Sequence, residues 1–317
     1  MLRYLVTLVA GLLLPLGQAL ANVPPLVDDD WLAARQGEPS IAILDVRSPI
    51  DGGDAVPFVE GHIPGSVNAG YTEQPWRVEQ GEVPGMLPPV DELERLVRRL
   101  GVDDADTVVV VPAGSGPTDF GSAARVFWTF RVLGHERVTI LNGGYRGWAA
   151  AGHAVATGEV HPEPGNFNAD FRDQMLVSAA DIEAAEANGL QLVDARPAEF
   201  FAGSEKHPAA RVAGTIPGSV NIAHQAFLSG GEVWRFDEDA VDSILADTEL
   251  DQSLRPVSFC NTGHWASTTW FALSEIAGNK EVGLYDGSMV EWTRDESRGV
   301  QVAKRGIARV LDFLGIQ

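Results

Sequence analysis

The residue best able to do chemistry in this chain is Cys260, its single cysteine. It follows the short apolar run 257–259 and precedes a run suited to a helix over 266–277. We therefore expect Cys260 at the carboxyl end of a parallel strand, where ligands bind in open α/β sheets. The backbone N–H groups of such a loop form a nest for anions, and the dipole of the following helix adds to it. Both favour a thiolate, which is the nucleophilic form of cysteine.

The predicted loop runs from Cys260 through Asn261, Thr262, Gly263, His264 and Trp265. His264 could accept a proton near neutral pH, or it could face solvent. Trp265 could wall a small pocket, or it could pack between two domains. Cys260 could also be buried and inert, as free cysteines often are.

A single cysteine restricts the other chemistry open to the chain. No internal disulfide can form, and no cysteine-rich zinc or iron–sulfur site is possible. A metal site built on Cys260 and His264 has too few soft ligands. We therefore expect neither a metal nor a cofactor.

The motifs around this loop belong to an internal repeat with a period of about 150 residues. The matching segments keep their order: 26–28 with 176–178, 43–47 with 192–196, 61–68 with 214–221, 108–111 with 256–259, and 141–148 with 285–292. This period is far too long for a solenoid, so the pattern indicates two similar domains. In both halves an Asp and an Arg end a strand, and we expect Asp45 with Arg47, and Asp194 with Arg196, to brace the neighbouring loops.

Short apolar strands alternate with amphipathic helices in each half. Asp28 and Ser178 suit helix N-caps. A helix over 91–100 is predicted because its apolar residues recur at helical spacing: Leu93, Leu96, Val97 and Leu100. This alternation favours an α/β fold in which each domain is a parallel sheet covered by helices on both faces.

The start of the chain has the three parts of a secretory signal peptide. Arg3 precedes the apolar run 4–16, and Ala19-Leu20-Ala21 is a small-x-small cleavage site. An uncleaved anchor is the alternative, although the apolar run is short for a membrane span. We expect a signal peptide over 1–21, a periplasmic protein, a cysteine-free domain over 22–157, a linker over 158–168 and a second domain over 169–317.

The charge balance excludes two classes of partner. The chain has 23 Lys and Arg against 44 Asp and Glu, which is a formal net charge of −21. A nucleic-acid binder needs the opposite balance to neutralise phosphates. An anionic membrane surface would repel this protein as well, so we expect no nucleic acid and no membrane partner after signal cleavage.

Three motifs in order resemble the tandem-domain sulfurtransferases of the rhodanese family. Phe58 with 62–65 (His-Ile-Pro-Gly) resembles the family's N-terminal signature, and 284–292 resembles its C-terminal signature. The segment 260–265 resembles its six-residue active-site loop. The resemblance covers nearly all of the predicted mature chain.

This resemblance implies a chemistry for Cys260. Its thiolate would take sulfane sulfur from a small thiosulfate-like donor, and a persulfide would form, held by the N–H groups of 261–265. Cyanide or a thiol would then remove that sulfur, in two half-reactions with ping-pong kinetics. The resemblance also implies that the cysteine-free N-terminal domain is inactive and forms the active-site cleft with its neighbour.

The sequence departs from the family where donors are bound. Phe200 stands where members that use thiosulfate or mercaptopyruvate place an arginine, and Asn261 and Thr262 stand where thiosulfate users place cations. Other cations that could serve lie in an insert of the second domain: Lys206, His207 and Arg211.

Other cysteine-based functions make different demands on this loop. Cysteine phosphatases need an arginine where this chain has Ala266, which excludes that class. A Cys–His hydrolase would need His264 as its base, which the spacing allows. The remaining alternative is a sulfur-carrier or persulfide-binding module, or a partner-binding module, without turnover.

Overall fold

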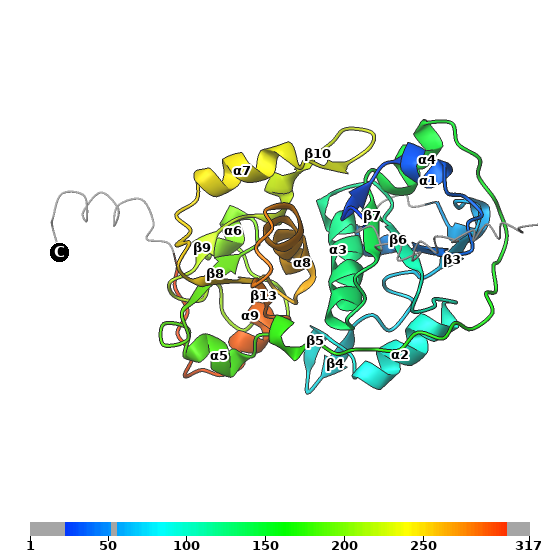
Figure 1. The fold of residues 1–317 in the computed structure, drawn as a ribbon. Coiled ribbons are helices and arrows are strands. Elements are labelled where there is room, and N and C mark those ends of the chain that lie inside the picture. Colours follow the sequence, from blue (N-terminus) through cyan, green and yellow to red (C-terminus); the bar gives the residue numbers. More distant parts are fainter. Residues whose placement is uncertain (1–22, 52–55, 303–317) are drawn as a thin grey trace, which may run out of the picture.

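The computed structural model describes residues 23–51 and 56–302, which form two α/β domains side by side (Figure 1). Each domain contains a parallel sheet flanked by helices, as the alternation of strands and helices predicts. The signal peptide predicted over 1–21 lies outside the described residues. Its cleavage and the periplasmic location therefore stay predictions, which the mass of the exported protein would test.

The N-terminal domain has, among the described residues, a five-stranded parallel sheet in the order β1-β7-β6-β2-β3. Its strands are β1 (Leu26–Val27), β2 (Ile41–Asp45), β3 (Ser66–Asn68), β6 (Thr107–Val111) and β7 (Val138–Leu141). Its helices are α1 (Asp29–Ala33), α2 (Val90–Arg99), α3 (Pro117–Val132) and α4 (Gly144–Ala150), with the short turns η1 (Pro49–Asp51) and η2 (Phe58–Glu60).

The C-terminal domain repeats this arrangement with a four-stranded sheet in the order β13-β12-β8-β9 over the described residues. Its strands are β8 (Leu190–Asp194), β9 (Val220–Asn221), β12 (Arg255–Phe259) and β13 (Gly283–Leu284). Its helices and turns are η3 (Asp173–Met175), α5 (Ala179–Glu183), α6 (Ala198–Phe201), η4 (His224–Phe227), α7 (Asp239–Ala246), α8 (His264–Phe271), η5 (Ala272–Ile276) and α9 (Ser288–Trp292). A parallel bridge from Leu176 to Leu284 stands where β1 pairs with β7 in the other domain.

Most helix boundaries follow the local sequence signals. Asp28 caps α1 by accepting from the N–H of Trp31, and Ser178 forms a capping box at α5. Two expectations need correction. The α2 helix begins at Val90, one residue earlier than predicted, and α8 begins at His264, two residues earlier than predicted. The helix begins early because Gly263 takes a left-handed φ of 71°, which closes the cysteine loop tightly.

Two antiparallel hairpins reach across the domain boundary in opposite directions. The hairpin of β4 (Val78–Gln80) and β5 (Val83–Met86) extends from the N-terminal domain, and Leu87 just beyond it donates its N–H to Asp286 (2.7 Å). The hairpin of β10 (Leu228–Ser229) and β11 (Arg235–Phe236) extends from the C-terminal domain, and the side chain of Asn142 bonds both backbone groups of Phe236. Both hairpins lie between the domains in Figure 1.

Helices α3 and α8 face each other at the centre of the molecule (Figure 1). Aromatic side chains fill the contact, because the ring centroid of Phe271 lies 5.0 Å from Phe127 and 5.8 Å from Phe120. The largest hydrophobic core is continuous through this interface and includes Val110 of one sheet and Val193 of the other. The two domains therefore share one core, which fixes their relative position.

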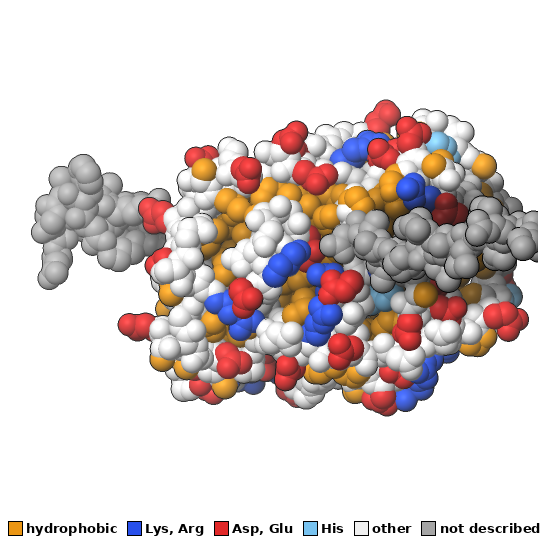
Figure 2. All heavy atoms as spheres, in the orientation of Figure 1, with side chains coloured by type: hydrophobic (Ala, Val, Ile, Leu, Met, Phe, Trp, Pro, Cys, Tyr) orange, Lys and Arg blue, Asp and Glu red, His pale blue; other side chains and the backbone are white. Residues whose placement is uncertain are grey.

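The described surface agrees with the acidic composition. Acidic side chains are spread over both domains on the face drawn in Figure 2. Within the described residues, no helix combines the length and hydrophobicity that a membrane span requires.

Candidate active site at the domain interface

Cys260 lies directly after β12, in a loop that is tied to the start of α9. The hydroxyl of Ser288 accepts hydrogen bonds from the N–H groups of Cys260 (3.0 Å) and Gly263 (3.1 Å). Met289 donates its N–H to the carbonyl of Cys260 at 3.1 Å. Ser288 reaches this position at a φ of 51°, which is uncommon for a residue other than glycine. Ser288 is not among the site residues that the sequence predicts, although its place after Asp286-Gly287 in the C-terminal signature marks the turn.

The loop leaves fewer N–H groups open than the sequence predicts. The N–H of Gly263 donates to the Ser288 hydroxyl, so the prediction that this N–H belongs to the anion nest is wrong. The N–H groups of Asn261 and Thr262 donate to no other described residue. Those of His264 and Trp265 begin α8 and have no acceptor within the helix. Four backbone donors next to Cys260 thus remain available to an anion.

A pocket of about 230 Å³ opens onto Cys260. Its lining comes from both domains: Ile50, Arg77, Thr118, His207, Cys260, Asn261, Thr262, His264 and Trp265. Only 1% of the Cys260 surface is exposed, so a reagent reaches its sulfur through this pocket. The cysteine is therefore buried without being sealed in hydrocarbon. A larger interdomain pocket of about 730 Å³ does not border Cys260, and its Arg131 and Arg172 are paired with Glu136.

His264 is buried and held by the other domain. Its Nε2 lies 2.9 Å from the carbonyl oxygen of Thr118, so Nε2 carries the hydrogen and donates. Its Nδ1 then accepts from the hydroxyl of Tyr71 at 2.8 Å. Burial, with the charge of Arg77 nearby, holds the pKa of His264 well below its usual range. His264 is neutral with both nitrogens occupied, so it neither faces solvent nor acts as a base for a Cys–His hydrolase.

Trp265 combines the two roles that the sequence left open. Its indole lines the pocket and donates from Nε1 to the hydroxyl of Thr118 in the other domain, at 3.1 Å. Its ring stacks on His224, with the centroids 4.6 Å apart. The ring of Phe200, the residue that departs from the family's arginine, packs edge-on against the Trp265 ring with the centroids 5.9 Å apart. Phe200 therefore lies behind the tryptophan that lines the pocket.

The structure supplies a cation that sequence reasoning did not find. Arg77, in the N-terminal domain, lines the pocket, and its guanidinium lies 4.7 Å from the ring centroid of Tyr71. Of the three cations predicted from the insert, only His207 lines the pocket. Lys206 and Arg211 instead donate to backbone carbonyls, so they do not serve this pocket. No local pattern marks Arg77, because the two domains bring it to Cys260 only by packing together.

The predicted Asp–Arg pairs are present and buried in both domains. Arg196 Nη2 lies 2.6 Å from Asp194 Oδ2 and also donates to the carbonyl of Gly214. Its Nη1 reaches the side-chain oxygen of Asn261 at 3.5 Å, which links the end of β8 to the cysteine loop. Arg47 and Asp45 repeat the pair at 2.6 Å.

A second buried arginine joins the domains beneath the cysteine loop. Arg125 on α3 is fully buried and donates to the carbonyls of Gly263 (3.1 Å) and Gly85 (3.2 Å). Its guanidinium also lies 3.5 Å from the Asp286 carboxylate. Asp286 therefore joins the two domains, because its carboxylate accepts from the N–H of Leu87 and lies next to the Arg125 guanidinium.

The equivalent loop of the N-terminal domain holds a carboxylate of its own. Asp119 is buried and accepts from the N–H groups of Ala113 (2.8 Å), Gly114 (2.7 Å) and Ser115 (3.1 Å). Burial raises the pKa of Asp119, although these three hydrogen bonds act in the opposite direction. The N–H groups that would face an anion in this loop are occupied, which explains how the cysteine-free loop is stabilised.

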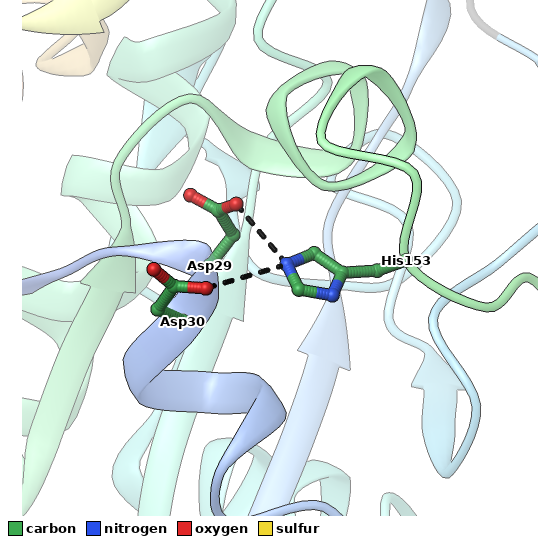
Figure 3. A group of neighbouring side chains, drawn as sticks. All are labelled: Asp29, Asp30 and His153. Atoms are coloured by element: carbon green, nitrogen blue, oxygen red, sulfur yellow. Dashed lines mark hydrogen bonds and ion pairs between the residues drawn. The ribbon is translucent and has the colours of Figure 1, made fainter.

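Among the described residues, one group outside the pocket could hold a metal ion. Asp29 and Asp30 of α1 lie next to His153, with one ligand atom from each within 4.8 Å of the others (Figure 3). His153 Nε2 is 3.1 Å from Asp29 Oδ2. The side chain of Asp30 is 94% exposed, and acidic residues belong in the first turn of a helix, so the cluster is accounted for as helix-end electrostatics.

Comparison with known proteins agrees with this geometry. A family model described as rhodanese-like domain matches residues 28–151 and 178–295. The 3-mercaptopyruvate sulfurtransferase of Escherichia coli K12 is 32% identical over 273 residues, which cover 84% of this chain and 94% of that protein. The thiosulfate sulfurtransferase of Rattus norvegicus is 33% identical over 280 residues, covering 85% and 92%. The crystal structure of SseA from Escherichia coli, a 3-mercaptopyruvate enzyme with the rhodanese fold, matches at a TM-score of 0.71 and 29% identity, covering 84% of this chain and 99% of that one. The chain therefore belongs to the rhodanese family, and its relatives are sulfurtransferases.

Proposed function

We propose that this protein is a sulfurtransferase that moves sulfane sulfur from a small donor to cyanide or a thiol through a persulfide on Cys260. The observation that carries the proposal is the pocket itself. The single cysteine directly follows a parallel strand and borders a space of about 230 Å³ with four open backbone donors beside it. The sulfurtransferase relatives support the same chemistry.

The reaction divides into two displacements at sulfur. With thiosulfate as donor, the Cys260 thiolate attacks the outer sulfur, the sulfur–sulfur bond breaks, and sulfite leaves with the electron pair. The product is a persulfide anion on Cys260, next to the N–H groups of Asn261, Thr262, His264 and Trp265. Cyanide then attacks the terminal sulfur, thiocyanate leaves, and the thiolate returns. Because one small pocket serves both steps, the donor product must leave before the acceptor enters, which gives ping-pong kinetics.

Replacing Cys260 by serine tests the proposal directly. We expect Cys260→Ser to abolish sulfur transfer to cyanide and to lose the persulfide, seen in the intact mass as one added sulfur atom after donor treatment. The wild-type far-ultraviolet circular dichroism and melting temperature should be retained, because the hydroxyl is close in size to the thiol. Transfer that survives in Cys260→Ser would rule out the mechanism.

A non-turnover sulfur carrier is the second candidate, and the loop itself favours it. Asn261 and Thr262 give the loop no cationic side chain, so the loop itself attracts an anionic donor less than a loop with arginine or lysine would. Repeated thiocyanate release per Cys260 supports the enzyme. A persulfide that forms once and passes to neither cyanide nor a thiol supports the carrier.

A further inference from the structure

The Cys260 pocket has an unbalanced charge. None of its described lining residues is a carboxylate, and its ionisable side chains besides Cys260 are Arg77, His207 and His264. Burial lowers the pKa of both histidines below the usual value. Among the described lining residues, Arg77 is therefore the side chain that stays positively charged at neutral pH.

Arg77 also lacks a partner for its charge. No described carboxylate lies within ion-pair distance of its guanidinium, whereas Arg47, Arg125 and Arg196 each have an aspartate. Among the described residues, its guanidinium instead packs on the face of the Tyr71 ring. A half-buried guanidinium without a counter-ion is costly, so it favours binding of an anion from solution.

The approach of the β4–β5 hairpin brings this charge to the cysteine loop. Gly85 has a φ of 91°, and a Cβ added to it would lie 2.6 Å from the carbonyl oxygen of Thr262 and 3.4 Å from Arg77 Nη1. Glycine at this position lets the hairpin backbone touch the loop and places the guanidinium beside Thr262. The charge that the loop side chains lack is therefore present from the opposite domain.

We propose that Arg77 of the N-terminal domain is the donor-specificity residue of the Cys260 pocket, where its guanidinium binds the anionic group of the incoming sulfur donor. With thiosulfate, that group is the sulfonate that departs as sulfite. Arg77 thus replaces, from across the interface, the cations missing at Phe200, Asn261 and Thr262. This inference rests on the proposed function for its substrate, although the charge preference it assigns to Cys260 is independent of turnover.

Alkylation of the single cysteine measures this preference directly. Iodoacetate and iodoacetamide have nearly the same size, and each forms a sulfur–carbon bond at Cys260 while iodide leaves, but only iodoacetate is an anion. We expect Arg77→Gln to lower the ratio of the iodoacetate rate to the iodoacetamide rate by about tenfold, the effect of one charge-assisted hydrogen bond. Arg77→Lys should keep most of the ratio, and the wild-type ratio should fall as salt is added.

The matched control is Arg146→Gln, which removes an arginine of the same domain that lines a different pocket. It should leave the ratio at the wild-type value. A fall of both alkylation rates together in Arg77→Gln would mean that Arg77 only positions Tyr71 and His264, and the specificity assignment would be wrong. An unchanged ratio would overturn it as well.

Steady-state kinetics with thiosulfate provide the second readout. Arg77→Gln should raise the KM for thiosulfate by about tenfold or more, with a smaller effect on kcat, because the lost contact acts in donor binding. The two ideas fail separately. Transfer by Cys260→Ser would refute the proposed function, whereas an Arg77→Gln protein with a wild-type KM and alkylation ratio refutes only the role of Arg77.

Discussion

Burial keeps two histidines neutral at the Cys260 loop: His264 is part of the loop, and His224 packs against it. His264 uses its two nitrogens to bind Tyr71 and Thr118 of the other domain. His224 stacks on Trp265 and donates from Nδ1 to the carbonyl of Ala195 at 3.0 Å. Each ring therefore positions a part of the pocket in its uncharged form.

The titration of His224 should be visible in the stability of the protein. Burial lowers the pKa of His224 in the folded chain to about 4, from 6.5. Between these values the unfolded chain binds a proton that the folded chain does not, so stability falls as the pH decreases from about 6.5 to about 4. The full shift corresponds to about 3 kcal/mol. His224→Asn should remove this part of the acid sensitivity, measured by urea unfolding at a series of pH values.

An exposed histidine provides the control for this measurement. The side chain of His161 is 85% exposed, and His161→Asn should follow the wild-type curve. All other ionisable groups are common to the three proteins, so their contributions cancel in the comparison. Parallel curves for wild type and His224→Asn would contradict the expectation.

At the scale of elements, the two equivalent loops use their backbone N–H groups differently. The C-terminal loop binds two of its N–H groups to Ser288 and leaves others beside Cys260. The N-terminal loop, between β6 and α3, binds three of its N–H groups to the carboxylate of Asp119. Asp119 therefore makes the N-terminal loop a structural support for α3, whose first turn carries Thr118.

Removing that carboxylate should destabilise the protein. Asp119→Ala takes the acceptor from the buried N–H groups of Ala113 and Gly114, so we expect the free energy of unfolding to fall by about 2–4 kcal/mol. Chemical denaturation measures this directly. Asp91→Ala, which removes an exposed aspartate from a surface ion pair on α2, should cost less than about 0.5 kcal/mol. Equal losses in the two variants would show that the carboxylate does not support the loop.

At the scale of the whole molecule, the two domains form one unit because a buried ion pair and the hydrophobic core both extend across their boundary. Arg125 binds Gly263 of the cysteine loop, Gly85 of the β5 strand and the Asp286 carboxylate. The α3–α8 aromatic contact continues the core around it. The candidate active site thus lies between two domains that cannot separate without exposing apolar surface.

Replacing Arg125 tests this coupling. Arg125→Met leaves the buried Asp286 without its cation, so we expect a loss of about 3–5 kcal/mol in the free energy of unfolding. The kcat/KM for sulfur transfer should fall as well, because the carbonyl of Gly263 loses its anchor. Arg95→Met, which breaks an exposed ion pair, is the control and should change neither quantity measurably. Wild-type stability in Arg125→Met would show that the contacts of Arg125 are not needed to hold the domains together.

Much of this could be predicted from the sequence because the relevant signals are local. The repeated strand-ending Asp–Arg pairs, the caps at Asp28 and Ser178 and the position of Cys260 after an apolar run all depend on neighbouring residues. Hydrophobic periodicity and turn chemistry report such short-range structure, so the α/β class and the placement of Cys260 followed from them.

The rest was decided only by tertiary structure, because it depends on contacts between residues far apart in the chain. Arg77, Tyr71 and Thr118 reach the pocket from the opposite domain, and no spacing in the sequence relates them to Cys260. The sequence by itself determined where the single cysteine lies along the chain and which backbone loop follows it. The packing of the two domains determined the charge and the size of the pocket around the Cys260 sulfur, and it made His264 neutral. Burial and the geometry of hydrogen-bond partners exist only once the shared core has formed.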